Sequence, residues 1–556
     1  MIFGGTTMRK WNKQFSAAVL AGAVCITATA TASANEETPK QQTKNDPTNV
    51  IMLVMDGSSD NVSTLARWYT GKPNAMDEIL TGAVRTYSAE SAITDSAPAA
   101  TALATGHKSN SGFVGVLPSK ITMPGVEGSE DDAFKPVANV LEGAQRNGMA
   151  TGIVSTSEIQ HATPAGFSAH AVSRSNYNDI AEQQVYRNMD VVLGGGAASL
   201  HDTRMDGEDL RPVLEKQKYD VVTTRDELLN TNSTKIWGAF APNALAYDLD
   251  RQALKNNEPS IAEMTEKAIS TLSKDEDGFF LMVEGSKIDW AAHANEPIAM
   301  ITDYIAFDNA VKEALDFAKE DGNTLVIAVT DHANSGITIG NTFTSGGYDK
   351  MDITEYVNPL REAKMTAEGA LSQLKEDRSN LEEVAALYGL TNLSTDERAA
   401  LQSSKNLAQT MPQLLSKRAN IGFTTGGHTG DDVFLYSFGP NRPTGLVENT
   451  DLAHIMAKTL NVDLAATTNA LFNDATEKLA AKGFDVIIDT ADVNNPKLVA
   501  KKGNTTYTLD ENKNTVKKDR ALPNGRVLSL TKSFNSVHVY NDKAFYVSED
   551  ILNFIK

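Results

Sequence analysis

Cysteine is nearly absent from this sequence, because its 556 residues include only Cys25, close to the N-terminus. A single cysteine cannot form an internal disulfide, so the folded chain has to be stabilised by its core and by bound groups such as metal ions. Long apolar runs are scarce too, and beyond the N-terminal region no stretch of about 18 uncharged apolar residues occurs. The sequence therefore predicts neither a disulfide-stapled domain nor a protein with a membrane span.

Positive charge is also in short supply, since 51 Lys and Arg residues face 71 Asp and Glu residues, a formal net charge of -20. This excess of acid repels nucleic-acid phosphates and anionic lipid, so we expect no nucleic-acid partner and no basic membrane-surface role for the chain as a whole. With 41% hydrophobic and 22% charged residues, the composition is that of a globular protein. An enzyme of this charge that handles phosphate would need local positive charge, which metal ions could supply.

The N-terminus has the three parts of a cleavable export signal. Basic residues between positions 9 and 13 precede an apolar stretch over residues 17–26, and Ala32-Ser33-Ala34 supplies the small residues of a cleavage site. We therefore predict that residues 1–34 are a signal peptide, that residues 35–48 are a flexible leader, and that the protein is exported to a periplasm or to the medium. A lipid anchor on Cys25 is the weaker alternative, because the residue before it is bulkier than such a cleavage site prefers.

Short apolar runs alternate with helical patterns along much of the chain. The runs are apolar on both faces, which is typical of parallel strands covered by helices on both sides. We therefore predict an α/β fold, built on a large, mainly parallel central β-sheet flanked by helices. Ligands of such sheets bind at the carboxyl ends of the strands, so the residues that follow the runs are the first candidates for chemistry. The runs span residues 50–55, 152–155, 191–193, 279–283 and 325–330.

Two segments depart from this alternation. Residues 333–427 are helical and charged in their middle, and we interpret them as an insertion that could act as a lid or as a dimer contact. From about residue 474, Lys, Asn and Thr appear in short alternating runs, which predict a small accessory β-rich module over residues 474–556. The main domain is accordingly expected to span residues 49–473.

A serine stands at the start of a predicted Ala-rich helix, in the run Asp95-Ser96-Ala97-Pro98. The free N–H groups and the dipole of a helix N-terminus favour a bound phosphate at such a position. Taken alone, the fragment is more simply an ordinary helix cap. The pair Asp56-Gly57, at the end of the first run, is equally ambiguous, because a carboxylate there usually caps the next helix. A functional interpretation of either fragment is supported only by the residues that follow the other strands.

Side chains that bind metal ions follow two further runs and also stand on a loop before another strand-like segment. Glu284 emerges from an apolar strand, where a carboxylate needs a cation or strong hydrogen bonds. Asp289 and His293 stand one turn apart if their segment is helical, which suits two ligands of one ion, although a helix-surface hydrogen bond would explain them as well. The pair Asp331-His332 and a histidine on a glycine-rich loop, His428, complete a set for two zinc-like sites and a harder, magnesium-like site.

An arginine follows another predicted strand end. The run His161-Ala162-Thr163-Pro164 comes after the second apolar run, and Arg174 lies thirteen residues beyond His161. A guanidinium can hold two phosphate oxygens in a fixed fork, although a lone surface arginine is usually a solvated charge. The interpretation of Arg174 as a phosphate ligand therefore depends on the candidate nucleophile and metal ligands that the rest of the sequence provides.

In order and in spacing, these motifs resemble those of the metal-dependent alkaline phosphatases, from Asn49 to about Ala470. The resemblance implies an enzyme that hydrolyses phosphate monoesters to phosphate and an alcohol through a phosphoserine intermediate. It implies Ser96 as the nucleophile, Arg174 as the clamp on the phosphate and Asp95 as the residue that orients the clamp. A homodimer is also implied, because the family is commonly dimeric.

The resemblance further implies two zinc ions and one magnesium ion. One zinc would be held by Asp289, His293 and His428, and the other by Asp56, Asp331 and His332 beside Ser96. Asp56 would also bridge to the magnesium site, together with Thr163 and Glu284.

The sequence departs from the family pattern beside the phosphate. His161 and Trp290 stand where some bacterial relatives have Asp and Lys, which bears on the preference of the third site for magnesium and on phosphate affinity. Ser58-Ser59 follow Asp56-Gly57 where many relatives have Met-Gly, so the local turn could differ. The insertion and the C-terminal module have no counterpart in the family pattern.

Two other functions remain open from the residues alone. A sulfatase or phosphodiesterase could share the fold superfamily, but the sulfatase pattern Ser-x-Pro-x-Arg ends here in Ala100. A secreted binding protein with structural metals would need neither Ser96 nor Arg174. We therefore predict an exported, metal-dependent phosphomonoesterase.

Overall fold

The computed structural model describes residues 48–201 and 203–556. The expected signal peptide, residues 1–34, and nearly all of the expected leader, residues 35–48, lie outside the described residues. Within the described residues, every helix is too short or too polar to cross a membrane.

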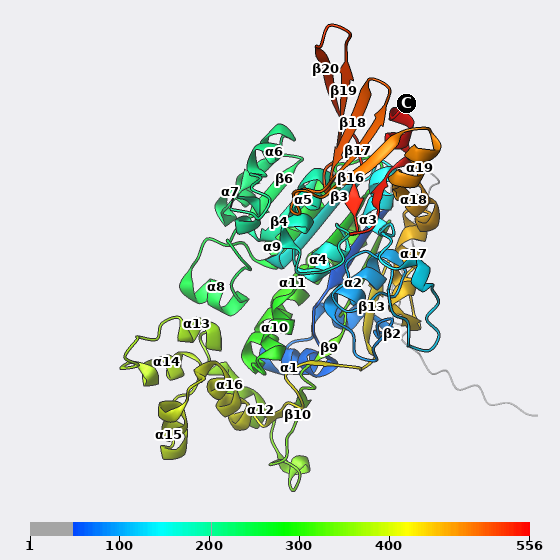
Figure 1. Cartoon of the computed structure of the whole chain (residues 1–556). Helices are drawn as coiled ribbons and strands as arrows, with labels where there is room; N and C mark the ends of the chain where they lie inside the picture. The colour runs from blue at the N-terminus through cyan, green and yellow to red at the C-terminus, as the bar shows by residue number, and fades with distance from the viewer. Residues whose placement is uncertain (1–47, 202) are drawn as a thin grey trace, which may run out of the picture. The chain divides into compact units, whose positions relative to one another are not determined.

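A ten-stranded sheet forms the centre of the fold (Figure 1). Its neighbouring strands pair in parallel, except that β13 runs antiparallel to both β2 and β8. The predicted α/β class with a mainly parallel sheet is thus confirmed. In sheet order the strands are β14 (Gly445–Glu448), β2 (Leu80–Arg85), β13 (Val433–Phe438), β8 (Thr324–Val329), β1 (Asn49–Val54), β7 (Phe279–Glu284), β3 (Ala150–Glu158), β4 (Val191–Gly195), β6 (Ile236–Ala239) and β5 (Asp220–Val222).

Strand β1 shows how one sheet builds two cores. Its six residues are all buried, and successive side chains of a strand point to opposite faces. Ile51 and Leu53 join one apolar cluster, whereas Val50, Met52 and Val54 join the other. The first face is covered by α1 (Asp60–Thr70), α9 (Ile261–Leu272), α10 (Lys287–His293) and α11 (Pro297–Asp321), and the second by α2 (Ser96–Thr105), α3 (Val140–Arg146), α5 (Tyr177–Arg187) and α17 (Asn449–Thr459).

Shorter helices fill the connections between these elements. They are α4 (Ala162–Gly166), α6 (Arg211–Lys216), α7 (Arg225–Asn230), α8 (Asp248–Leu254) and α18 (Leu464–Leu471).

The one antiparallel strand of the sheet brings a distant loop to the carboxyl edge. β13 begins beside the end of β8, with Leu435 opposite Val329. The segment before β13 therefore meets the segment after β8, and β12 (His428–Thr429) pairs there with β9 (Ala333–Asn334). A parallel strand in this place would have carried His428 to the opposite edge of the sheet.

Beyond the short pairing of β10 (Thr338–Ile339) with β11 (Ile421–Gly422), the interval 333–427 contains five α-helices. Arg361 donates hydrogen bonds to the carbonyl oxygens of Trp68 and Tyr69 in α1, and Thr366 donates to the buried carboxylate of Asp250 in α8. These contacts hold the helices against the main sheet domain. The helices are α12 (Thr354–Arg361), α13 (Ala367–Leu371), α14 (Leu381–Leu387), α15 (Thr395–Ser403) and α16 (Leu407–Arg418).

The C-terminal residues form two small sheets with an apolar cluster of their own. Leu498, Tyr507 and Leu509 pack in this cluster with Leu479 and Ile551. One sheet joins β15 (Asn473–Asp474), β22 (Phe545–Val547) and β21 (Val539–Tyr540). The other is an antiparallel meander of β16 (Asp485–Asp489), β17 (Lys497–Lys502), β18 (Thr505–Asp510), β19 (Thr515–Ala521) and β20 (Val527–Ser533), and the helices α19 (Ala475–Ala481) and α20 (Glu549–Phe554) accompany it.

A buried ion-pair network joins α3 to α5. The Glu142 carboxylate lies 2.6 Å from Arg187 Nη1 and 3.0 Å from His170 Nε2. Burial alone would raise the pKa of Glu142, but the charge of Arg187 and the contact with His170 outweigh burial and lower that pKa to about 2. The carboxylate thus stabilises the fold in its ionised form.

The variant Glu142→Gln is expected to lower the free energy of unfolding at pH 7 by roughly 3 kcal/mol, since a tenfold change in proton affinity corresponds to about 1.4 kcal/mol. A depressed folded-state pKa means that this contribution is complete above the unfolded-state pKa of about 4.5 and is lost as the pH falls towards 2. Urea unfolding midpoints of the variant and the parent should therefore differ most at neutral pH and converge in acid. The exposed substitution Glu383→Gln is the control, and equal midpoints for Glu142→Gln at pH 7 would contradict the expectation.

Candidate active site

Three carboxylates meet where neighbouring parallel strands end. Glu284 is the last residue of β7, and Asp56 and Asp331 each lie two residues beyond the ends of β1 and β8. In the sheet, β1 lies between β7 and β8, and its last residue, Val54, stands opposite Glu284 on one side. The sheet topology therefore places all three acids at one edge.

The first cluster consists of Asp56, Asp331 and His332, whose ligand atoms lie within 4.8 Å of one another and are all buried. His332 Nε2 is 3.2 Å from Asp331 Oδ2 and 3.6 Å from Asp56 Oδ1. Burial and the neighbouring carboxylates raise the pKa of Asp56 well above its usual range, and neither of its oxygens has a hydrogen-bond partner. Buried carboxylates in this state need a cation, so the donor set fits a bound metal ion.

The second cluster joins α10 to the loop before β13. Asp289 and His293 lie one helical turn apart, and His293 Nε2 is 3.5 Å from Asp289 Oδ2. His293 Nε2 also lies 3.1 Å from His428 Nε2.

The protonation of these two imidazoles follows from their other nitrogens. His293 Nδ1 lies 2.9 Å from the carbonyl oxygen of Gly426, and His428 Nδ1 lies 2.8 Å from that of Thr94. A carbonyl oxygen can only accept, so in the neutral form of each ring Nδ1 carries the proton and Nε2 holds a lone pair. Two lone pairs that face each other fit a cation between them, and the donor set of two imidazoles and a carboxylate suits zinc.

A third cluster shares Asp56 with the first and adds His161 and Glu284. Burial raises the pKa of Glu284, and Ser155 Oγ donates a hydrogen bond of 2.5 Å to Glu284 Oε2. Glu284 Oε1, Thr163 Oγ1 and His161 Nδ1 are buried without hydrogen-bond partners. Together with Asp56, this cluster therefore offers carboxylate and hydroxyl oxygens of the magnesium type.

Ser96 lies next to the first cluster. It is the first residue of α2, with Asp95 as the N-cap, and its Oγ is 3.0 Å from His332 Nε2. The helix begins here because proline suits the first turn, where a backbone N–H has no partner within the helix and the N–H that Pro98 lacks is not needed. The hydroxyl thus stands among metal-type ligands and at the positive end of a helix dipole.

Arg174 reaches the same place from the loop between α4 and α5. Its guanidinium forms an ion pair with Asp95 through Nη1 and donates to His161 Nε2 through Nη2 at 3.0 Å. Burial by itself would raise the pKa of Asp95, but Arg174 lowers it. Burial and the charge of Arg174 lower the pKa of His161 to about 3, so the ring is neutral and can accept this hydrogen bond. Its one proton then lies on Nδ1, so the ring has no free lone pair for a metal ion while Arg174 donates to it. A carboxylate and an imidazole together orient the guanidinium.

Trp290 follows Asp289 in α10 and stands edge-on to His161, with 5.7 Å between ring centroids. The ammonium group of Lys287 lies 4.4 Å from the Trp290 ring on the same helix. Trp290 and His161 therefore form one wall beside Arg174.

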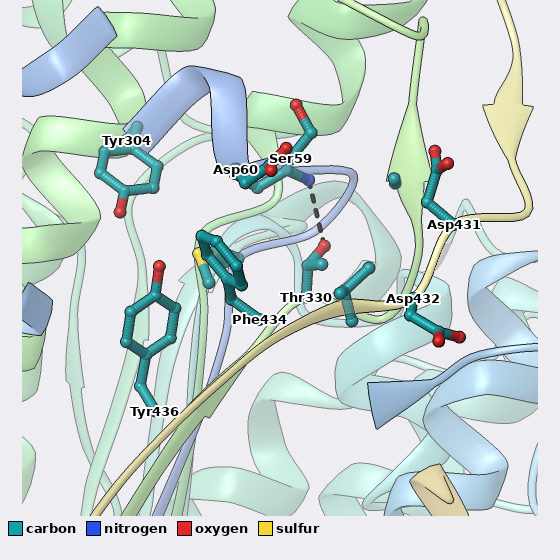
Figure 2. Close-up of a pocket in the computed structure, with 12 residues that line it drawn as sticks. Ser59, Asp60, Tyr304, Thr330, Asp431, Asp432, Phe434 and Tyr436 are labelled. Carbon is teal, nitrogen blue, oxygen red and sulfur yellow. Dashed lines mark hydrogen bonds between the residues drawn. The ribbon is translucent and has the colours of Figure 1, made fainter. Parts of the chain in front are cut away.

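A separate pocket of about 160 Å³ lies near the segments that flank the first cluster. The backbone N–H of Ser58 donates a hydrogen bond of 3.0 Å to Thr330 Oγ1. Figure 2 shows Tyr304 and Tyr436 with their hydroxyl groups pointing toward each other. None of the clustered acids and histidines lines this pocket. We therefore place the candidate active site at the three clusters and not in this cavity.

Several residues that form hydrogen bonds at the site were not predicted from the sequence. Asn334 Nδ2 donates to Asp289 Oδ1 at 2.6 Å, and Ser286 Oγ lies 3.1 Å from Ser155 Oγ beside Glu284. Asn334 stands two residues beyond His332, so its place after a strand end was a signal that could have found it. The carbonyl groups that orient His293 and His428 belong to any residue type, and they leave no signal in a sequence.

The side chains that the sequence suggested as nucleophile, phosphate ligands and metal ligands meet in this region. A serine hydroxyl at a helix N-terminus, an arginine held by a carboxylate and three metal-type clusters define the class of protein, a metal-assisted phosphoryl-transfer hydrolase.

Comparisons with known proteins identify the family within this class. The family model described as alkaline phosphatase matches residues 47–462. Alkaline phosphatase 3 of Bacillus subtilis (strain 168) is 33% identical over 488 residues, which cover 82% of this chain and 99% of that protein. Alkaline phosphatase 4 of the same organism is 35% identical over 448 residues, which cover 76% of this chain and 90% of that protein.

Solved structures agree with these relatives. The alkaline phosphatase of Thermus thermophilus superposes with a TM-score of 0.66 and 27% identity, over 75% of this chain and 93% of that one. The cold-active alkaline phosphatase of Shewanella sp. superposes with a TM-score of 0.64 and 27% identity, over 74% of this chain and 99% of that one. The chain belongs to the alkaline phosphatase family and is a hydrolase of phosphate monoesters. The family and the enzyme class predicted from the sequence are confirmed.

Proposed function

We propose that this enzyme transfers the phosphoryl group of a monoester to Ser96 and then to water, in a site that holds two zinc ions and one magnesium ion. The observation that supports this most directly is the position of Ser96 Oγ, 3.0 Å from His332 Nε2 and at the N-terminus of α2. A structural metal site would need neither a serine there nor an arginine beside it.

The three clusters would hold the three ions. Asp289, His293 and His428 would bind one zinc, and Asp56, Asp331, His332 and Ser96 the other. Asp56, Thr163 and Glu284 would bind magnesium through their oxygens. A zinc-like ion could use His161 Nδ1 only if the ring gave up its hydrogen bond from Arg174. When bound, such ions lower the pKa of a hydroxyl or a water and neutralise charge on phosphoryl and leaving oxygens.

The reaction itself runs through Ser96. Its Oγ gives up its proton to solvent and attacks phosphorus, while the bond from phosphorus to the alcohol oxygen breaks and that oxygen takes a proton from water. Water then cleaves the new ester on Ser96, which releases phosphate and restores the hydroxyl. The N–H groups at the start of α2 stabilise the negative phosphoryl oxygens throughout.

Arg174 would donate two N–H groups to the phosphoryl oxygens. Its side chain is 26% exposed, so part of the guanidinium remains open to a ligand while Asp95 and His161 hold it in place. Because this orientation exists before substrate binds, little entropy is lost when the phosphate arrives. Trp290 would close the site at the side of His161.

A comparison of substrate classes tests the proposal. The mature, metal-loaded protein is expected to hydrolyse a chromogenic phosphate monoester faster than the matching diester or sulfate by on the order of 10³-fold or more, since a site built for a charged terminal phosphoryl group rejects groups that lack its oxygens. Faster turnover of the diester or of the sulfate would be consistent with the fold superfamily but would show that the proposed substrate class is wrong. Turnover of none of the three would favour a binding protein.

We further propose that the enzyme is an exported homodimer. Export is supported by the signal-like N-terminal sequence. Dimerisation is supported by the half-exposed Leu80 and Leu446 on β2 and β14, the strands at one edge of the main sheet. Residues 49–473 are proposed as the catalytic domain, with residues 333–427 as an insertion that contributes a lid or a dimer contact and residues 474–556 as an accessory module. Sedimentation velocity of the mature protein measures the association state directly.

A further inference from the structure

The last hairpin of the C-terminal meander exposes apolar side chains on an open edge. β20 is the edge strand of its five-stranded sheet, and each of its seven residues is exposed. Val527, Leu528 and Leu530 are 57%, 54% and 55% exposed. An exposed apolar edge strand of this kind tends to associate with other surfaces. Such a strand is therefore expected either to bind a partner or to be protected from aggregation.

The pairing register explains why these side chains are uncovered. Val516 pairs with Lys532 and is the last residue of β19 in the apolar cluster of the module. The next two pairs on the same face are Lys518 with Leu530 and Arg520 with Leu528. The face that packs into the module near Val516 thus continues past the cluster as a mixed strip of leucine and basic residues. Figure 1 draws the hairpin running beyond the rest of its sheet.

The hairpin is basic although the chain is acidic. Residues 515–533 contain five basic residues, Lys517, Lys518, Arg520, Arg526 and Lys532, and one acidic residue, Asp519, in a chain of net charge -20. Asp519 is already paired with Lys517 at 2.9 Å. Within the described part of the chain, Lys518, Arg520, Arg526 and Lys532 have no carboxylate partner within 4.0 Å, so no ion pair neutralises their charge. The ammonium groups of Lys518 and Lys532 lie over aromatic rings, 5.2 Å from that of Tyr507 and 4.8 Å from that of Phe534.

We propose that the β19–β20 hairpin docks this enzyme on an anionic lipid bilayer. Leu528 and Leu530 enter the interfacial region, and Lys518, Arg520 and Arg526 bind the headgroup phosphates. A soluble polyanion would satisfy the basic residues but would leave the leucines in water, whereas the boundary of a bilayer accepts both kinds of side chain within a few ångströms of each other.

The acidic body of the chain does not prevent this docking. Arg520 lies four residues beyond Val516, which is roughly 13 Å of extended strand. Repulsion between exposed charges falls off over a Debye length of about 8 Å at physiological ionic strength. A hairpin of this length can therefore reach the lipid while the acidic surface behind it remains largely screened.

Sedimentation with vesicles tests the proposal on the mature, full-length protein. The protein is expected to bind vesicles of phosphatidylcholine with one quarter phosphatidylglycerol, and to bind vesicles of phosphatidylcholine alone at least about tenfold more weakly, since each basic residue near an anionic surface contributes a several-fold gain in affinity. The double variants Lys518→Gln/Arg520→Gln and Leu528→Ser/Leu530→Ser should each lower binding by about tenfold or more. Raising the salt concentration should release the parent protein.

A matched control distinguishes the effect of the hairpin's charges from the effect of the protein's net charge. Lys72→Gln/Lys350→Gln removes the same two charges from exposed positions in the main domain and should bind like the parent. All variants should keep the parent's turnover of a soluble monoester, which also shows that they fold. Equal binding to both kinds of vesicle, or equal binding of the hairpin and control variants, would overturn the proposal. Binding that survives the leucine substitutions but is displaced by a soluble polyanion would overturn it in favour of a soluble ligand.

Discussion

Replacing Ser96 by alanine is expected to lower kcat for a phosphate monoester by on the order of 10⁴-fold or more, because the covalent route disappears with the nucleophile. Alanine fits the first turn of α2 and keeps the Asp95 cap, so the variant should fold and melt like the parent. Steady-state turnover of a chromogenic monoester measures the effect.

The phosphorylated form of the enzyme gives a second readout. After a brief reaction quenched in acid, intact-mass measurement should find a phosphoryl group on the parent and none on Ser96→Ala. The matched control Ser345→Ala removes an exposed hydroxyl from the interval 333–427 and should leave both turnover and labelling unchanged. A loss of less than tenfold in Ser96→Ala, or a label that persists in it, would assign the nucleophile to another group.

Removing metal by exhaustive chelation is expected to lower turnover by on the order of 10³-fold or more, and zinc with magnesium should restore it. The structural reason lies in Asp56, Asp331 and Glu284, whose pKa values are raised by burial and whose orphaned oxygens have no protein partner. Without cations these acids must take up protons or repel each other, so the chelated protein should also melt at a lower temperature.

Metal content distinguishes the three clusters independently of activity. Elemental analysis of the purified enzyme should find about three ions per chain, one for each cluster. His161 lies beside the third cluster, and His161→Asp would add a carboxylate oxygen there, so this variant should shift the metal content toward magnesium. Full activity in protein that has lost its metal, with no change in melting temperature, would overturn the assignment of all three sites.

The fold class was predictable because it depends on a pattern that local sequence carries. Apolar runs flanked by helical segments can bury both faces only in a mainly parallel sheet between helices, and β1, β7 and β8 appear where those runs are. The antiparallel direction of β13 was not predictable, since its sequence is equally suited to either direction. That direction brings His428 to the site, and it is decided by which neighbours the strand meets.

The candidate site divides in the same way. The residue types of the site could be predicted from the sequence, because carboxylates and histidines that follow apolar strands have few other uses. Which of them lie together in each cluster could not be predicted. His161 illustrates the difference, because the sequence placed it beside the phosphate and only the fold shows that its Nε2 accepts from Arg174 while its Nδ1 remains buried without a partner.

By itself, the sequence determined the chemistry available to this protein: a serine, an arginine and a set of acids and histidines in the order of the alkaline phosphatases, in an acidic chain that can form no disulfide. Tertiary structure alone decided how that chemistry is used. Ser96 and His332 are 236 residues apart in the chain and 3.0 Å apart in space, a distance set by the packing of α2 against the sheet. The orientation of His293 and His428 depends on backbone carbonyl groups, and the exposure of Leu528 and Leu530 depends on where the module's core ends. These features arise from contacts between segments distant in sequence, so no local pattern could have contained them.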